Sequence, residues 1–218
     1  MITLAEENYL KTILNIYLNS KRKVSTNEIA REMNTSPASV SDMLKKLLEK
    51  GLVKYEKYKG AELSKKGSVN AINILRKHRL WETFLVNRLG FNWSEVHDLA
   101  EELEHVNSEK LINKLDAFLG YPKFDPHGEP IPTKEGKIPF SETISLDKLQ
   151  EGILANVMGV NSDEKTYLDY LTKLNISIGS KIIIKERIDF DQSLKIKINN
   201  KNHHISYDVA KNLLIKIK

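Results

Sequence analysis

Histidine and carboxylate side chains recur at helical spacing between Lys77 and Ser108, in the segment KHRLWETFLVNRLGFNWSEVHDLAEELEHVNS. His78 and Glu82 are four residues apart, and a second group follows with offsets of four, seven and eight residues from its first histidine. Such offsets place side chains on one face of an α-helix. The second group consists of His97, Glu101, Glu104 and His105. Imidazole and carboxylate groups gathered in this way are ligands for a first-row transition metal.

The chain contains no cysteine, so its candidate ligands are nitrogen and oxygen atoms. This donor set suits Mn²⁺ or Fe²⁺ better than an ion that prefers thiolate. Glu101, Glu102 and Glu104 crowd the segment beside His105, and solvent, a basic partner or a cation has to relieve their repulsion. A purely solvated acidic face is therefore the alternative to a metal site.

Other site chemistry finds no support in the sequence. It has no Gly-x-Ser-x-Gly motif, no phosphate-cradling glycine-rich loop and no His-Glu-x-x-His pair. A di-metal carboxylate enzyme would need Glu-x-x-His on two helices of a bundle, whereas Glu102-x-x-His105 occurs once. Such an enzyme stays as the alternative from another functional class.

Composition and charge bound the kind of protein. The 218 residues are 40% apolar and 29% charged, which is typical of a folded chain with two or three compact units. The net charge is +5 over residues 1–72, −2 over residues 73–140 and +2 over residues 141–218. The basic first segment suits a polyanion and the acidic middle segment suits a cation. Lacking cysteine, a long apolar run and a signal peptide, the chain is expected to be cytoplasmic, without a membrane partner.

The elements that carry these residues begin with a predicted helix over residues 4–18. A second helix follows Ser25 or Thr26, with Glu28 placed for a capping box, and a third starts at Ser36-Pro37 and ends at Gly51. LVKYEKYKGAELSKKG then reads as a strand, a turn at Lys59-Gly60 and a strand. This order predicts a winged helix-turn-helix, whose second helix enters the DNA major groove. A helical domain with a hairpin and no ligand is the plainer interpretation.

Small side chains in the first turns of the third helix would allow close approach to DNA, and the lysines that follow would reach phosphate. The expected DNA-binding residues are Thr26, Ser36, Pro37, Ala38, Ser39, Ser41, Asp42, Lys45, Lys46 and Lys59.

Three further helices are predicted, over residues 65–90, from Trp93-Ser94 through His105, and over residues 109–119. Their apolar surface calls for a packing partner, for which we expect a second copy of the chain. Residues 120–141 hold five of the six prolines and read as a linker. The pattern changes from about Leu146: a helix is predicted at 163–174, and KIIIKERI and SLKIKINN after it alternate apolar and charged residues, which predicts a small five-stranded barrel.

With LRKHRLWETFLVNRLGF, EVHDLAEELEHVNSEKL and GYPKFDPHGEPIP following the helix-turn-helix, the sequence resembles the diphtheria toxin repressor family over essentially its whole length. The resemblance is strongest to the three-domain branch that responds to manganese. It implies a mainly α fold with a small β part. The domains would be a winged helix-turn-helix (1–72), a dimerisation and metal-binding domain with a proline-rich linker (73–140) and an SH3-like β-barrel domain (141–218).

The resemblance also implies two metal sites. One would draw on Glu82, Asp125 and His127, with Asp163 or Glu164 from the C-terminal domain and with His78 and His97 close by. The other would draw on Glu101, Glu104 and His105, with Asn8 from the first helix. The assignment of His78 and His97 to one site or the other stays open.

Two positions depart from the family pattern. Asn8 stands where manganese-responsive members have aspartate and iron-responsive members have methionine, which weakens the second site. Asp125 stands where close relatives have cysteine, which favours Mn²⁺ or Fe²⁺. Glu101, at a position where iron-responsive members carry cysteine, favours manganese.

The function implied is a cytoplasmic, homodimeric transcriptional repressor that is not an enzyme. It would bind a pseudo-palindromic DNA operator in response to Mn²⁺, or alternatively Fe²⁺, and regulate metal-ion homeostasis. Other divalent ions such as Zn²⁺ would substitute in vitro. A winged-helix protein that uses its middle domain for dimerisation alone is a third interpretation.

Overall fold

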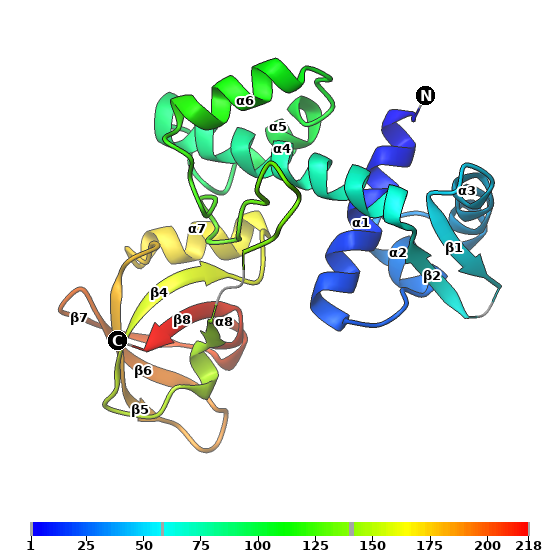
Figure 1. Cartoon of the computed structure of the whole chain (residues 1–218). Helices are drawn as coiled ribbons and strands as arrows, with labels where there is room; N and C mark the ends of the chain where they lie inside the picture. The colour runs from blue at the N-terminus through cyan, green and yellow to red at the C-terminus, as the bar shows by residue number, and fades with distance from the viewer. Residues whose placement is uncertain (1, 58, 140–141, 218) are drawn as a thin grey trace. The chain divides into compact units, whose positions relative to one another are not determined.

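The computed structural model describes residues 2–57, 59–139 and 142–217 (Figure 1). The chain divides into two compact units. The first runs through His78 and includes Glu104–Asn107 and Pro132–Lys137. The second holds Arg79–Leu103, Ser108–Ile131 and the chain from Ile138 onward. The boundary predicted at residues 140 and 141 lies outside the described residues.

The first unit contains the predicted winged helix-turn-helix. Its helices are α1 (Leu4–Ser20), α2 (Thr26–Glu32) and α3 (Pro37–Glu49), and its hairpin pairs β1 (Val53–Glu56) with β2 (Gly60–Leu63). Local signals set where the helices begin. Thr3 with Glu6 and Ser25 with Glu28 form capping boxes, and the side chain of Ser36 caps α3 in front of Pro37.

The core of the first unit joins the apolar faces of α1, α2 and α3 to the start of α4 (Lys65–Leu89). Leu10, Ile29 and Leu44 are fully buried in it. Gly67 allows the first turn of α4 to lie against the wing, because a Cβ there would come 1.9 Å from the carbonyl oxygen of Leu52.

Helices of the second unit are the rest of α4, α5 (Val96–Leu103) and α6 (Glu109–Phe118). A small apolar cluster of Leu80, Ile112, Leu115 and Ile131 joins α4 to α6 and to the linker. The expectation that the middle helix continues through His105 is wrong, because α5 ends at Leu103 and Glu104 and His105 lie in the turn that follows. The chain then becomes extended at Ser108, which caps α6.

The rest of the second unit is an antiparallel sheet ordered β3-β8-β4-β5-β6-β7. Its strands are β3 (Ile144–Ser145), β4 (Leu154–Val160), β5 (Lys181–Arg187), β6 (Leu194–Ile198), β7 (Lys201–Ile205) and β8 (Leu213–Ile217). The short helices are η1 (Leu146–Lys148), α7 (Lys165–Lys173) and α8 (Tyr207–Lys211). Figure 1 shows α7 beside β4, where Leu168 and Leu171 enter the core of the sheet.

The small C-terminal β domain is confirmed, but a closed five-stranded barrel is not. Six strands form an open order within the described residues, with β3 and β7 at its two edges. Closure requires the edge strands to pair with each other, and β3 is only two residues long. No helix of the described residues has the length and apolar character needed to span a bilayer.

Candidate metal centres and DNA-binding surface

Three buried side chains of the kinds that bind metal ions meet in the second unit, and we call them the Asp125 cluster: Glu82, Asp125 and His127. Glu82 lies on α4, whereas Asp125 and His127 lie on the linker turn. One ligand atom from each residue lies within 4.8 Å of the others. Their exposed fractions are 2%, 5% and 6%. Two carboxylates and an imidazole therefore converge where water is largely excluded.

Backbone hydrogen bonds hold the linker turn in shape. Oδ1 of Asp125 accepts the N–H of His127 at 2.8 Å and the N–H of Glu129 at 3.0 Å. Gly128 has φ of +84°, and a Cβ there would lie 1.9 Å from the carbonyl oxygen of Met158. Only glycine tolerates both conditions, so this residue lets the turn lie against β4.

The ring of His127 is oriented by the backbone. Its Nε2 lies 2.8 Å from the carbonyl oxygen of Trp93, and a carbonyl oxygen only accepts, so Nε2 carries the proton. Nδ1 then has its lone pair available and lies 3.6 Å from Oε1 of Glu82. A histidine whose second nitrogen donates to a carbonyl is arranged as a metal ligand.

The Asp125 cluster carries an excess of negative charge. Burial raises the pKa of Asp125 well above its usual value, and the charges of Glu82 and Glu129 raise it further, while Arg79 lowers it. Oδ2 of Asp125 is buried without a hydrogen bond, and Nε of Arg79 lies 3.5 Å from it. A divalent cation would relieve this excess and satisfy the oxygen.

His97 extends the Asp125 cluster toward solvent. Its Nδ1 lies 3.7 Å from Oε1 of Glu82 and 3.6 Å from Oδ2 of Asp163, and its Nε2 lies 3.6 Å from Oε1 of Glu101. The His97 side chain is 39% exposed and that of Asp163 is 62% exposed. Glu164 is exposed at the N-cap of α7.

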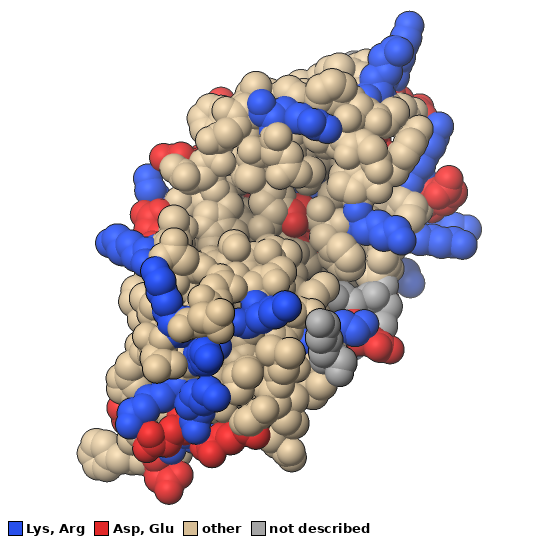
Figure 2. All heavy atoms as spheres, turned by 90° about the vertical axis from the view of Figure 1, so that its left-hand side faces the viewer, with Lys and Arg blue, Asp and Glu red and all other residues tan. Residues whose placement is uncertain are grey.

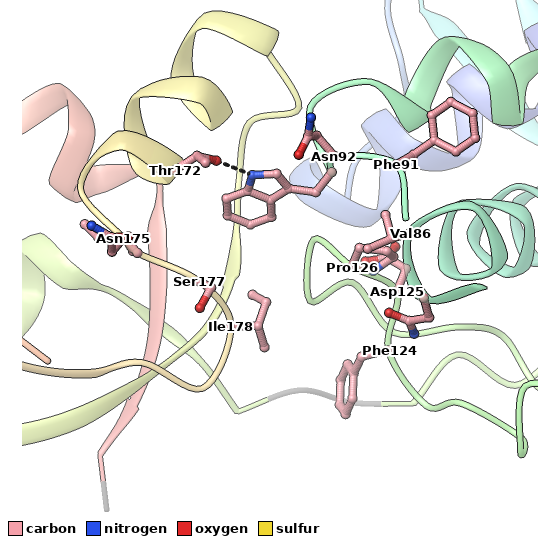
Figure 3. Close-up of a pocket in the computed structure, with 13 residues that line it drawn as sticks. Val86, Phe91, Asn92, Phe124, Asp125, Pro126, Thr172, Asn175, Ser177 and Ile178 are labelled. Atoms are coloured by element: carbon pink, nitrogen blue, oxygen red, sulfur yellow. Dashed lines mark hydrogen bonds between the residues drawn. The ribbon is translucent and has the colours of Figure 1, made fainter. Parts of the chain in front are cut away.

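A pocket of about 620 Å³ borders Asp125 in the second unit. Figure 3 shows Asp125 and Pro126 at one wall and Thr172, Asn175 and Ser177 at the other. Trp93 also lines the pocket, and its Nε1 donates a hydrogen bond to Oγ1 of Thr172 at 2.9 Å. The same residue provides the carbonyl that orients His127, so the pocket wall and the cluster share a support.

A second group of ligand-type side chains lies in the first unit. This Glu104 cluster consists of Glu7, Asn8, Lys11, His78, Glu104 and His105. Glu104 is fully buried, and its Oε2 accepts from Nζ of Lys11 and from Nδ1 of His78, both at 2.7 Å. Nδ1 of His105 lies 2.6 Å from Oε2 of Glu7.

Two buried side-chain oxygen atoms of the Glu104 cluster have no hydrogen bond. They are Oδ1 of Asn8 and Oε1 of Glu104, and Nε2 of His105 lies 3.8 Å from the latter. Burial raises the pKa of Glu104, but the hydrogen bonds and charges of His78 and Lys11 outweigh burial, so the pKa is lowered overall. Protein cations thus hold this carboxylate in its ionised form.

The structure groups the predicted ligands differently from their spacing in the sequence. Because α5 ends before Glu104, the expected face shared by His97, Glu101, Glu104 and His105 does not form. Glu101 neighbours His97 in the second unit, whereas His78 bonds Glu104 in the first. Lys11 was not among the predicted site residues. The available signal was its position three residues after Asn8, one turn further along the same helix.

The helix-turn-helix presents the predicted DNA-binding residues mostly to solvent. Those exposed are Ser36, Pro37, Ala38, Ser39, Asp42, Lys45, Lys46 and Lys59, while Thr26 and Ser41 are half-buried. Lys45 pairs with Asp42 at 3.0 Å, and Lys59 pairs with Glu56 at 2.7 Å. The face drawn in Figure 2 shows both basic and acidic side chains scattered among uncharged residues.

These features define a winged-helix protein with a buried carboxylate and imidazole cluster and a C-terminal antiparallel sheet. Three family models match the chain in that order. They are the N-terminal DNA-binding domain of iron-dependent repressors (residues 1–61), their metal-binding and dimerisation domain (64–133) and the FeoA domain (144–217).

Individual relatives agree with the family models. A solved manganese-dependent transcriptional repressor in complex with manganese is 33% identical, with a TM-score of 0.89 over 98% of this chain and 100% of that one. An uncharacterised helix-turn-helix regulator of Methanocaldococcus jannaschii is 36% identical over 52% of this chain and 90% of its own length. The iron-dependent repressor IdeR of Mycobacterium tuberculosis is 36% identical over 58% of this chain.

The match spans about half of IdeR, 54% of its length. The chain belongs to the diphtheria toxin repressor family of metal-dependent transcriptional repressors. The two models of iron-dependent repressors, the solved manganese-dependent repressor and IdeR are repressors rather than enzymes, so the di-metal enzyme alternative is set aside.

Proposed function

We propose that this chain is a homodimeric repressor that binds a pseudo-palindromic DNA operator when Mn²⁺ is bound. Fe²⁺ is the alternative ion, and Zn²⁺ would substitute in vitro. The observation that carries the proposal is the convergence of Glu82, Asp125 and His127, with a buried carboxylate oxygen lacking a hydrogen bond. Oxygen and nitrogen donors without thiolate suit Mn²⁺ and Fe²⁺.

Within this proposal, Glu82, Asp125 and His127 hold the ion, and His97 and Asp163 approach it from the exposed side. A bound divalent ion would supply the positive charge that these carboxylates lack. Trp93 keeps Nδ1 of His127 available, and Gly128 keeps the linker turn against β4. The pocket beside Asp125 provides a route of entry.

Coupling to DNA is proposed to use α4, which is continuous from the wing to Glu82. Fixing the linker turn on Glu82 would favour one arrangement of the α4 helices in a dimer, and DNA would select the same arrangement. Metal and DNA would then strengthen each other's binding. The winged helices would read DNA through α3, with Lys45, Lys46 and Lys59 on phosphate.

The remaining predicted ligands are given no part in the main metal site of this proposal. They are His78, Glu101, Glu104, His105, Asn8 and Glu164. Several of them already have protein partners. His105 bonds Glu7, and Glu104 bonds both Lys11 and His78. Oδ1 of Asn8 and Oε1 of Glu104 are buried atoms of this set without a hydrogen bond. We expect any ion there to bind more weakly than at the Asp125 cluster.

A homodimer is proposed because the helical part of the second unit exposes several large apolar side chains. They include Leu89, Leu111, Phe118 and Tyr121, which are 57%, 43%, 60% and 69% exposed. Apolar groups at this exposure mark an association surface. Light scattering of Leu111→Glu with Phe118→Glu should then show a monomer, whereas an unchanged mass would place the interface elsewhere.

The test begins with selection of duplexes from a random DNA library in the presence of Mn²⁺. Fluorescence anisotropy of the selected duplex is then measured with Mn²⁺ and with EDTA. We expect Mn²⁺ to tighten binding, and Asp125→Asn and His127→Ala to abolish that gain. Asp208→Asn, an exposed carboxylate on α8, is the matched control. Equal affinity in Mn²⁺ and EDTA would refute metal control.

A further inference from the structure

Lys11 is a lysine in an unusual place, buried on α1 with only 6% of its surface exposed. Lysine is rarely buried unless its charge is paired, because removing an ammonium group from water costs several kcal/mol. Its partner is Glu104, which is fully buried in the 104–107 turn and lies 2.7 Å away. This ion pair joins the first helix of the winged helix to a turn 93 residues later in the chain.

The pair uses an oxygen that a metal ion would need. Oε2 of Glu104 already accepts from Lys11 and from Nδ1 of His78, both at 2.7 Å. These two donors occupy both lone-pair sites of that oxygen, and the ammonium group also repels a divalent cation placed beside it. Only Oε1 of Glu104 is left, so the carboxylate cannot offer both oxygens to an ion.

The charge balance of the Glu104 cluster differs from that of the Asp125 cluster. With histidines left out of both counts, the two carboxylates of Glu7 and Glu104 have the ammonium groups of Lys11 and Lys77 near them. Lys77 is near enough to Glu7 and Glu104 for both carboxylates to attract its ammonium group. The Asp125 cluster instead sets Glu82, Asp125 and Glu129 against the guanidinium of Arg79. The first cluster is therefore neutralised by the chain itself, and the second is not.

We propose that the ammonium group of Lys11 is a resident cation of the Glu104 cluster, where it ties α1 to the 104–107 turn in place of a metal ion. This connection is present whether or not metal is available. It stabilises the metal-free first unit and lowers the affinity of the cluster for a divalent ion. Assigning the metal response to the Asp125 cluster alone rests on the proposed function.

Three variants test the proposal in the full chain. Lys11→Met keeps the length and removes the charge, Lys11→Glu adds a carboxylate, and Glu104→Gln removes the partner's charge. Lys50→Met and Lys50→Glu are matched controls, because Lys50 pairs with Glu6 of the same helix at 2.7 Å but is 41% exposed. The measurements are thermal unfolding in EDTA and Mn²⁺ content per chain after equilibrium dialysis.

We expect Lys11→Met to lower the Tm in EDTA by roughly 10 °C, because a buried carboxylate loses a cation. Lys11→Glu should bind an additional Mn²⁺ per chain and recover stability when Mn²⁺ is added. Glu104→Gln should leave the Mn²⁺ content of the otherwise native chain unchanged. The Lys50 variants should change the Tm by no more than a few degrees and leave the Mn²⁺ content unchanged.

The proposal is overturned if Lys11→Met keeps the native Tm in EDTA, or if Glu104→Gln releases Mn²⁺. If Lys11→Glu does not fold, Lys11→Met and Glu104→Gln decide the matter. Failure of the proposed function shows up elsewhere, as retention of Mn²⁺ by Asp125→Asn. The stability of Lys11→Met in EDTA is independent of that result.

Discussion

Oδ1 of Asp125 accepts the backbone N–H of His127 at 2.8 Å, so one candidate ligand positions another two residues further along. The other oxygen of the same carboxylate is buried without a hydrogen bond, 3.5 Å from Nε of Arg79. The carboxylate thus uses one oxygen to shape the turn and leaves the other for a cation.

Replacing Asp125 with Asn should stabilise the metal-free protein and remove its stabilisation by Mn²⁺. The raised pKa of Asp125 means that the folded state holds this proton more tightly than the unfolded state does. In EDTA, stability therefore falls as pH rises from the usual aspartate range through the raised pKa. An amide avoids that loss, so the Tm of Asp125→Asn at pH 7.5 in EDTA should exceed that of the native chain.

In Mn²⁺ the native chain should have the higher Tm. Asp125→Asn lacks one ligand, so its affinity for Mn²⁺ should fall by roughly tenfold or more. Thermal unfolding with EDTA and with Mn²⁺ measures both effects, and Asp208→Asn controls for charge. A Tm in EDTA below the native value would show that ionised Asp125 is not a source of strain.

Replacing Gly128 with Ala should disrupt the linker turn. The added Cβ would lie 1.9 Å from the carbonyl oxygen of Met158, so either the turn or β4 has to move. Gly120→Ala is the control, because Gly120 has a similar φ of +76° with nothing within 4 Å. We expect Gly128→Ala to weaken Mn²⁺ binding by more than tenfold and Gly120→Ala to cost only about 1 kcal/mol of stability. Equal behaviour of the two variants would contradict the role given to close packing.

Replacing Glu28 with Gln should make the stability of the winged helix depend less on pH in the acid range. Its hydrogen bond from Arg22 and those from Ser25 lower the pKa of Glu28 to about 2. A lowered pKa contributes stability above the unfolded value of 4.5, which is lost as pH falls from 4.5 toward 2. Urea denaturation across this pH range should show a steeper decline for the native chain than for Glu28→Gln. Glu32→Gln, exposed on the same helix, should follow the native curve.

Replacing Lys45 or Lys46 with Ala should weaken binding to all duplexes and reduce the salt dependence. Both lysines are exposed on α3 beyond its first turns. Each lost phosphate contact lowers the slope of log affinity against log salt by about one. Anisotropy titrations over a range of salt concentration measure the slope, with Lys181→Ala on β5 as the control. An unaltered slope in both variants would remove α3 from the phosphate contacts.

Local rules were enough to predict much of the fold. Ser25 with Glu28 and Ser36 with Pro37 mark helix starts that the structure reproduces, because capping depends on residues within one turn. The same rules failed at Glu104 and His105, where helical spacing continued in the sequence after the helix had ended. The predicted closure of the C-terminal sheet into a five-stranded barrel was also wrong, since closure depends on pairing between strands far apart in the chain.

The sequence by itself determined the kinds of ligand atom, the order of the elements and the family, because residue type and short-range spacing carry that information. Tertiary structure alone decided which charges meet. It brought Lys11 to Glu104 across 93 residues and placed Asp125 beside Glu82 of α4. The physical reason is that the effect of burial on a charge depends on the neighbours that packing supplies. Identical carboxylates can therefore become a closed ion pair in one unit and a candidate metal site in the other.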